Sequence, residues 1–96
     1  MHQDLEAKAQ ILKTLGHPVR LKIVAILAGK CSYVNELMDS LGLHQPVLSQ
    51  HLKLMKKNGV LKSQREGVRI CYSLKDETIA EIARILQLAR QKDQLS

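Results

Sequence analysis

Residues 34–74, VNELMDSLGLHQPVLSQHLKLMKKNGVLKSQREGVRICYSL, carry two helical patterns followed by an alternating one. Apolar residues recur at helical spacing over 34–41 and again over about 46–57, and a glycine at position 42 separates the two runs. Apolar residues three and four positions apart share one face of a helix, and glycine favours a helix end. The sequence therefore predicts a short helix, a tight connection and a second helix.

The pattern changes after position 60, where apolar and polar residues begin to alternate. Glu66 and Gly67 form a turn-like pair in the middle of this segment. Every second residue beyond the pair is apolar: Val68, Ile70, Tyr72 and Leu74. A period of two is typical of a strand, so residues 60–74 are predicted to form a β-hairpin.

Three further helical segments flank this region. A first helix is predicted up to Gly16, with apolar residues at Leu5, Ala9, Leu12 and Leu15. Pro18 suits the first turn of a second, mostly apolar helix that should end near Gly29. A fifth helix, before a polar tail at 92–96, is expected from the spacing of Ile79, Ile82, Ala83, Leu86 and Ala89. Residues 1–96 are expected to form a single domain.

The composition excludes several classes of protein. The 96 residues include 2 Tyr and no Trp or Phe, which argues against a protein that stacks single-stranded bases on aromatic rings. Two cysteines are too few for a disulfide-dense secreted scaffold, and the first residues lack the apolar core of a signal peptide. No apolar run approaches the roughly 20 residues of a membrane helix. We therefore expect a cytoplasmic protein without membrane contacts.

The positive charge is concentrated on one part of the chain. The 15 Lys and Arg residues and 9 Asp and Glu residues give a net charge of +6. Residues 44–70 hold six basic residues and one acidic residue, so this segment alone carries +5. A solvated polar face is one explanation of a charge run. Here the excess falls on one predicted helix and the adjoining hairpin, as expected of a protein that binds duplex DNA.

The helix predicted at 46–57 has two distinct faces. Leu48, Leu52 and Met55 share one face with His51, and this face can pack against a core. The opposite face carries Pro46, Ser49, Gln50, Lys53 and Lys57. Its hydroxyl, amide and ammonium groups can hydrogen-bond base edges or phosphates in a major groove. The arrangement predicts a helix-turn-helix, and an antiparallel helical hairpin is the alternative.

These segments, together with LKTLGHPVRLKIVAIL at residues 12–27, resemble the ArsR/SmtB family of winged helix-turn-helix transcriptional regulators. The resemblance extends through residues 34–74 to the closing helix. It implies a mainly α-helical fold with a small β-hairpin wing, and a homodimer whose first and last helices form the interface. Members of the family are usually repressors that a metal ion, a metalloid or a sulfur-redox signal releases from DNA.

The resemblance also assigns roles to individual residues. DNA contacts are expected from base-facing residues on the second helix of the pair, from its lysines and from the wing: Gln45, Pro46, Ser49, Gln50, Lys53, Lys56, Arg65 and Arg69. The dimer interface is expected at Leu5, Leu12, Ile82 and Leu86. His44 stands where the family often has a serine that caps the helix, a change expected to cost about 1 kcal/mol. His51 is interpreted as a packing residue and Arg20 as a helix-start residue.

The family's usual metal sites are missing from the sequence. Tyr33 and Asn35 occupy the positions of a Cys-x-Cys pair. The ligand positions near the last helix hold Asp76, Thr78, Ala89 and Lys92. One carboxylate cannot furnish a tetrahedral zinc site. The four histidines also lack ligand-like spacing: His2, His17, His44 and His51. We therefore expect no metal site and no cofactor.

Cys31 and Cys71 have two interpretations. They can be reduced, semi-buried residues that act as small hydrophobes. Alternatively, the fold that the resemblance implies has a strand before the third helix paired with the second wing strand, which would bring the thiols together. A disulfide or polysulfide link would then move the wing and weaken DNA binding, provided that the Cα atoms lie roughly 4.4 to 6.8 Å apart. A regulator without any inducer, controlled by its own abundance, is a third possibility.

The function that the sequence favours is a sequence-specific, double-stranded-DNA-binding regulator, a homodimeric repressor acting at a palindromic operator. The chain has no Gly-rich phosphate loop, nucleophile motif or acid/base carboxylate pair, so no enzymatic activity is expected. The alternative function is a winged-helix module that binds another protein and has only incidental affinity for DNA.

Overall fold

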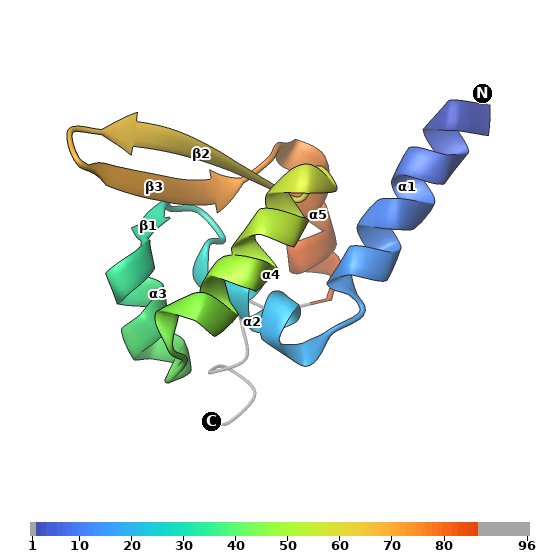
Figure 1. The fold of residues 1–96 in the computed structure, drawn as a ribbon. Helices are drawn as coiled ribbons and strands as arrows, with labels where there is room; N and C mark the ends of the chain where they lie inside the picture. Colours follow the sequence, from blue (N-terminus) through green and yellow to red (C-terminus); the bar gives the residue numbers. More distant parts are fainter. Residues whose placement is uncertain (1, 87–96) are drawn as a thin grey trace.

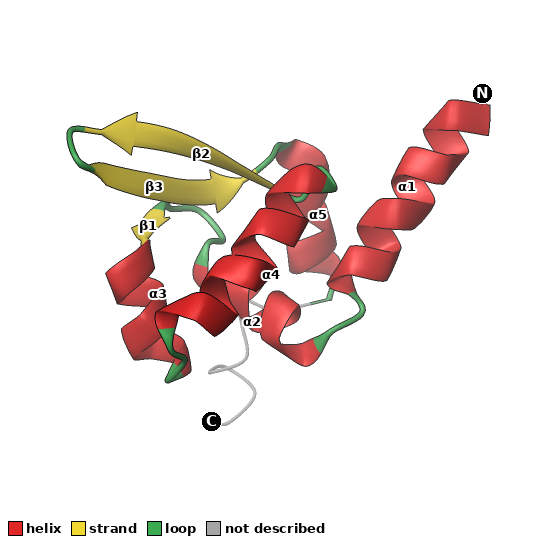
Figure 2. Ribbon diagram, viewed as in Figure 1, coloured by secondary structure: helices red, strands yellow, loops and turns green. Residues whose placement is uncertain are grey.

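A computed structural model describes residues 2–86 as a helical body that carries a three-stranded antiparallel sheet (Figure 1 and Figure 2). The helices are α1 (His2–Leu15), α2 (Pro18–Ile26), α3 (Val34–Leu41), α4 (Gln45–Lys57) and α5 (Glu77–Ile85). The strands are β1 (Ser32–Tyr33), β2 (Leu61–Glu66) and β3 (Arg69–Leu74). The mainly α-helical fold with a small hairpin wing is confirmed.

Local capping explains where α2 begins. Pro18 occupies the first turn, and the His17 Nδ1 atom accepts a hydrogen bond of 3.1 Å from the Val19 N–H, which is one of the donors that a helix start leaves unpaired. The predicted end near Gly29 is wrong by about one turn, because the helix ends at Ile26. The chain then makes a turn in which Gly29 adopts a φ of 81°.

The two helices of the central pair match the prediction closely. Helix α3 ends at Leu41. The next residue, Gly42, has a φ of 65°, a left-handed conformation that would be strained in a residue with a side chain. Helix α4 begins at Gln45, one residue before the predicted start. The His44 side chain makes no capping hydrogen bond, as expected for a histidine at that position.

The sheet joins the wing to the segment that leads into α3. Its strand order is β1-β3-β2, so β1 pairs with β3 as the resemblance implied. Figure 1 shows the β2–β3 hairpin projecting from the helical body. The reversal lies at Gly67 and Val68 instead of the predicted Glu66 and Gly67, and Glu66 is therefore the last residue of β2.

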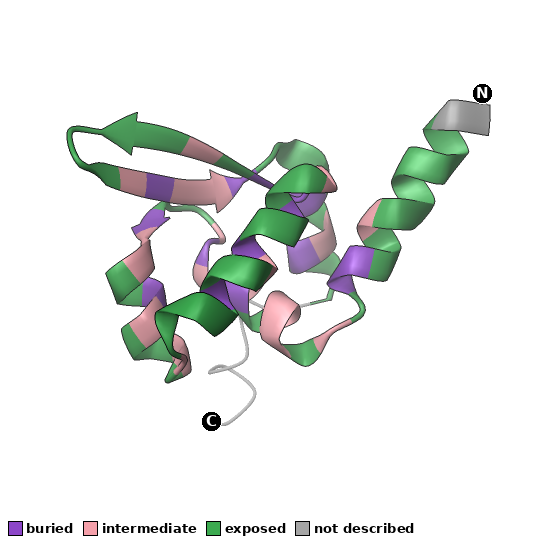
Figure 3. Cartoon of the chain, viewed as in Figure 1, coloured by how far each residue is buried: buried purple, intermediate pink, exposed green. Residues whose placement is uncertain are grey.

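The core lies where α2, α3, α4 and α5 meet the base of the hairpin (Figure 3). Its largest fully buried side chains are Ile23, Leu27, Leu37, Leu48, Leu52, Met55, Leu61 and Ile79. Helix α1 is mostly exposed and joins the core through Leu15. A polar link also ties α1 to the end of α4, because the Asn58 Nδ2 atom donates a hydrogen bond of 2.9 Å to the Thr14 Oγ1 atom.

Helix α5 begins with a well-formed cap. The Asp76 carboxylate accepts hydrogen bonds from the Thr78 and Ile79 N–H groups at 3.0 and 3.3 Å. The predicted continuation of this helix to Ala89, and the polar tail at 92–96, lie outside the described residues. None of the helices in the described part of the chain has the length and apolar character needed to cross a membrane.

Candidate nucleic-acid interface

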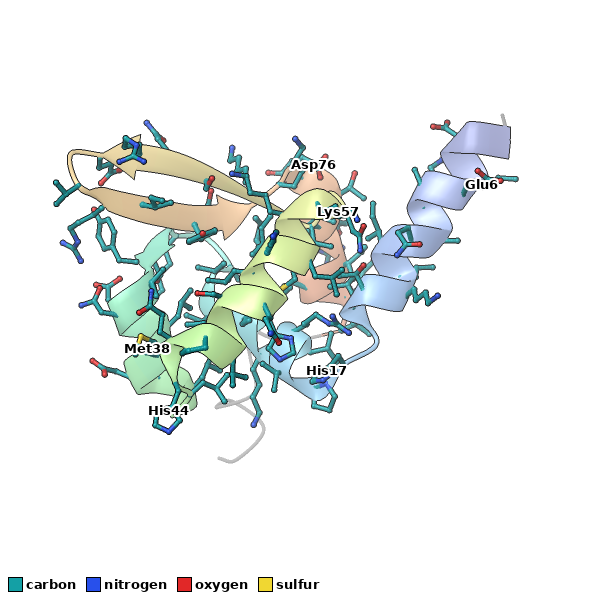
Figure 4. The ribbon with its side chains drawn as sticks, viewed as in Figure 1. Glu6, His17, Met38, His44, Lys57 and Asp76 are labelled. Carbon is teal, nitrogen blue, oxygen red and sulfur yellow. A yellow bond between two sulfur atoms is a disulfide. The ribbon has the colours of Figure 1, made fainter. Side chains whose placement is uncertain are left out.

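Helix α4 runs across one side of the molecule, between the labelled residues His44, which precedes it, and Lys57, its last residue (Figure 4). Its inner face packs into the core, where Leu48, Leu52 and Met55 retain 0%, 2% and 0% of their exposure. Burial of these side chains fixes the rotation of the helix about its own axis. The opposite face is therefore held toward solvent.

The outer face of α4 carries most of the candidate contact residues. The structure leaves all six of those on this helix exposed: Gln45, Pro46, Ser49, Gln50, Lys53 and Lys56. Sequence reasoning missed Val47, which is 45% exposed and presents methyl groups beside the polar side chains. The face thus offers hydrogen-bonding groups, ammonium groups and an apolar contact, all of which suit base edges or phosphates. Their contacts with DNA stay predictions.

The wing brings the two candidate arginines to opposite sides of one turn. Arg65 is exposed on β2, and Arg69 is exposed at the start of β3. Val68, between them in the chain, is 96% exposed at the reversal. A shallow hollow of about 340 Å³ separates the wing from α3, and Gln45 at the start of α4 lines it together with Arg69. Residues far apart in the sequence therefore share one surface.

Arg69 is also held against the segment that precedes α3. Its guanidinium carbon lies 3.5 Å from the centre of the Tyr33 ring, and its Nη2 atom donates a hydrogen bond of 3.4 Å to the Asn35 side-chain oxygen. A cation over an aromatic ring is attracted by the ring's electron density. These contacts hold the Arg69 guanidinium at the junction between the wing and the start of α3.

Glu66, the one acidic residue in the basic segment, has a partner of its own. The Tyr33 hydroxyl donates a hydrogen bond to the Glu66 Oε1 atom, and this bond raises the pKa of the Tyr33 hydroxyl above its usual value. Sequence reasoning missed the pair, because the two residues lie 33 positions apart. The contact gives the wing a second tie to the start of α3.

His51 packs between α4 and the start of α2, as the sequence interpretation expected. Its ring lies 4.8 Å from that of His17, centre to centre, in an edge-on arrangement. Burial lowers the pKa of His51, with smaller contributions from His17 and Arg20. Arg20 lies in the first turn of α2, consistent with its interpretation as a helix-start residue.

The two cysteines are joined in a disulfide across the sheet. Their Cα atoms are 5.7 Å apart, within the range that a disulfide requires. Cys71 is buried in β3, and Cys31, expected to be semi-buried, is exposed just before β1. The structure therefore does not show the two cysteines as reduced small hydrophobes. A role in redox sensing stays a prediction.

The candidate dimer residues divide into two groups. Leu5, Leu12 and Leu86 are exposed by 64%, 63% and 53%. Ile82 is instead partly buried and packs against the protein's own core. Sequence reasoning missed Ile85, whose side chain is 64% exposed on the neighbouring part of α5. Exposed apolar side chains on α1 and at the end of α5 are thus free to meet another surface.

The family's metal-ligand positions hold residues with other contacts. The Tyr33 hydroxyl donates a hydrogen bond to Glu66, the Asn35 side-chain oxygen accepts one from Arg69, and Asp76 caps α5. Ala89 and Lys92 lie outside the described residues.

A helix-turn-helix followed by a β-hairpin on a helical body defines the winged helix-turn-helix class. The chain belongs to the ArsR family of bacterial regulatory proteins, whose profile, described as "Bacterial regulatory protein, arsR family", matches residues 17–63. The crystal structure of the transcriptional repressor PagR of Bacillus anthracis is similar to this chain, with a TM-score of 0.83 and 39% sequence identity over 90% of this chain and 99% of that chain. The family predicted from the sequence is confirmed.

Two further relatives bear on assembly and function. The HTH-type transcriptional repressor SmtB of Mycobacterium tuberculosis is 41% identical over 78 residues, which are 81% of this chain and 58% of that protein. The chain thus matches little more than half the length of that relative. The solution structure of Mb0332 from Mycobacterium bovis, described as a homodimeric winged helix-turn-helix DNA-binding domain, has a TM-score of 0.84 and 25% identity, covering 97% of this chain and 86% of that chain.

Proposed function

We propose that this protein is a sequence-specific transcriptional regulator that binds double-stranded DNA as a homodimer. Helix α4 enters the major groove, and the wing follows the flanking backbone. The observation that supports this most directly is the two-sided character of α4, with a fully buried apolar face and an exposed polar and basic face. The net charge of +5 on residues 44–70 supplies the attraction to phosphates.

The homodimer is supported by the apolar side chains on α1 and α5. Leu5, Leu12, Ile85 and Leu86 are each more than half exposed. Burying such side chains against a second copy removes apolar surface from water. Two copies related by a two-fold axis would present their α4 helices to major grooves about 34 Å apart, which calls for a palindromic operator. The homodimeric relative from M. bovis supports the same assembly.

Repression at an operator is the mode of action that we propose, since the relatives SmtB and PagR are repressors. Such a protein acts in the cytoplasm and needs neither a cofactor nor enzymatic activity. The Cys31–Cys71 disulfide is the proposed signal input. It ties β3 of the wing to the segment before α3, so its formation fixes the wing relative to α4 and is expected to weaken DNA binding.

The test is a comparison of two duplexes at several salt concentrations. One duplex is selected by the full-length protein from a random-sequence library, and the other has the same composition in scrambled order. Fluorescence anisotropy should give a log affinity that falls steeply with log salt, and a preference of about 10³-fold or more for the selected duplex. Repeating the titration after reduction of the disulfide tests the signal input.

The second candidate function is a winged-helix module that binds another protein. The 45% and 37% exposure of Val47 and Leu54 on α4 is the observation in its favour, because apolar side chains on a surface helix suit a protein partner. Equal affinity for the selected and scrambled duplexes would favour this candidate over the regulator.

A further inference from the structure

One cluster of metal-ligating side chains lies outside the face of α4. The sulfur atoms of Cys31 and Cys71 and a carboxylate oxygen of Glu66 all lie within 4.8 Å of one another. The sheet register explains why they meet. Tyr33 and Gln64 both pair with Cys71, and residues two positions apart in a strand point to the same side. Glu66 therefore falls on the same side of the sheet as Cys71, and the disulfide places Cys31, just before β1, beside them.

We propose that the reduced protein binds one thiophilic divalent cation, such as Zn²⁺ or Cd²⁺, through Cys31, Cys71 and Glu66. Thiolates select soft and borderline cations, and a carboxylate is a common additional ligand. Zinc–sulfur bonds of about 2.3 Å and zinc–oxygen bonds of about 2.0–2.2 Å place tetrahedral ligand atoms roughly 3.5–3.8 Å apart. The ligand atoms already lie within 4.8 Å of one another, and in the reduced protein the two sulfur atoms would have to move apart from bonding distance to reach this spacing. Three protein ligands leave the fourth position to water.

The disulfide and the cation exclude each other, because both use the two sulfur atoms. A cellular dithiol supplies two electrons, cleaves the Cys31–Cys71 bond and becomes a disulfide itself, leaving two thiols. The cation then displaces one proton from each thiol to solvent and forms two metal–sulfur bonds. Glu66 contributes a carboxylate oxygen as the third ligand.

Neighbouring side chains orient the carboxylate ligand, and solvent reaches the cluster from one side. The Tyr33 hydroxyl holds one oxygen of Glu66 by a hydrogen bond, and such outer contacts orient metal ligands. The Arg69 guanidinium lies over the Tyr33 ring and steadies that side chain in turn. Cys31 and Glu66 are exposed while Cys71 is 2% exposed, so a cation can approach from the solvent side.

A cation at this site would connect β2, β3 and the residue just before β1, whereas the disulfide connects only β3 with that residue. The inference goes beyond the proposed function, since it requires the cysteine pair but no DNA. The site was not expected from the sequence, because it contains no histidine and none of the positions that the family uses for metals. Its three ligands come together only through strand pairing.

The test uses the full-length protein, reduced with a phosphine and then freed of reductant in the absence of oxygen. It is titrated with Co²⁺, whose bonds to thiolates give charge-transfer absorption in the near ultraviolet and whose tetrahedral complexes absorb in the visible. We expect one equivalent of Co²⁺ to produce both signals and one equivalent of Zn²⁺ to remove them. The oxidised protein should give neither signal, because its sulfurs are bonded to each other.

Two variants test the ligands individually. Cys31→Ser, at an exposed position that should not disturb folding, should lose more affinity than the roughly 10–100-fold that loss of an outer-shell partner costs. Glu66→Gln should lower the affinity at least 10-fold while the charge-transfer band persists. Glu77→Gln, which changes an exposed carboxylate on α5, is the matched control and should bind Co²⁺ as the parent protein does. Circular dichroism checks that each variant is folded.

Two results would overturn the proposal. The first is a reduced, folded protein that gives no thiolate charge-transfer band with Co²⁺. The second is an affinity that Glu66→Gln leaves unchanged, since the three-ligand site requires the carboxylate. DNA binding is measured separately by anisotropy, so either result would leave the proposed regulator function standing, and a protein that fails to bind DNA can still pass the Co²⁺ test.

Discussion

Replacing Thr14 with valine tests whether α1 is energetically coupled to the end of α4. The Thr14 hydroxyl donates to the Gln10 carbonyl at 2.7 Å and accepts from the Asn58 side chain at 2.9 Å. Thr14 is 2% exposed, and Asn58 is the C-cap residue that follows α4. Valine has nearly the same shape as threonine, so the substitution removes the hydroxyl with little change in packing.

The expected cost follows from the burial of the two partners. A neutral hydrogen bond contributes a net 0.5–1.5 kcal/mol or so to stability. Asn58 is only partly buried, so water can replace some of what its amide loses. We therefore expect Thr14→Val to lower the free energy of unfolding by about 1 kcal/mol, equivalent to about 4–8 °C in Tm for a chain of this size.

The assay is a double-mutant cycle with Asn58→Ala, measured by urea unfolding at one fixed protein concentration, because the stability of a dimer depends on concentration. The single changes should interact by about 1 kcal/mol. Thr14→Ser retains the hydroxyl and should retain the coupling to Asn58. Strict additivity, within about 0.3 kcal/mol, would refute the reasoning and leave the two helices coupled only through apolar packing.

Three further predictions concern DNA binding, assembly and pH. Gln50→Ala should reduce discrimination between selected and scrambled duplexes by about 1–3 kcal/mol, whereas Lys53→Ala should weaken both alike in anisotropy titrations; a uniform loss for Gln50→Ala would contradict direct base contact. Leu86→Glu should convert dimers to monomers in light scattering, and a persistent dimer would move the interface off the end of α5. Because burial lowers the pKa of His51, the folded protein binds fewer protons than the unfolded chain, so stability should fall as pH drops below about 6.5. His51→Gln should flatten that fall in urea titrations at several pH values; a slope equal to that of the parent protein would exclude His51 as the source.

The parts of the fold that the sequence predicted well are those set by local patterns. The extent of α3 follows from its apolar spacing and from Gly42, whose left-handed conformation ends the helix. The two faces of α4 follow from the same kind of spacing, and Leu48 and Leu52 are buried as expected. The end of α2 was less predictable, because the apolar run continues through Leu27 and Ala28, beyond Ile26, where the helix ends.

The candidate site was less accessible to prediction wherever it depends on pairing between distant segments. A shift of one residue in the hairpin turn makes Glu66 a strand residue, and the strand register then sets its side chain beside Tyr33. The spacing on α5 likewise cannot distinguish a side chain that faces the protein's own core from one that faces a partner. Ile82 belongs to the first kind and Ile85 has the exposure expected of the second.

The cysteine link closes a covalent ring that contains α3, α4 and β2, since its two ends are 40 positions apart. Closing a loop of that length restricts the unfolded chain and is worth about 4 kcal/mol of stability, a large fraction of the roughly 5–15 kcal/mol that holds a typical domain together. Oxidation should therefore stabilise this part of the chain against unfolding and, according to the proposed function, weaken its binding to DNA. When both are measured without DNA, the oxidised protein should therefore resist heat and proteases better than the reduced protein.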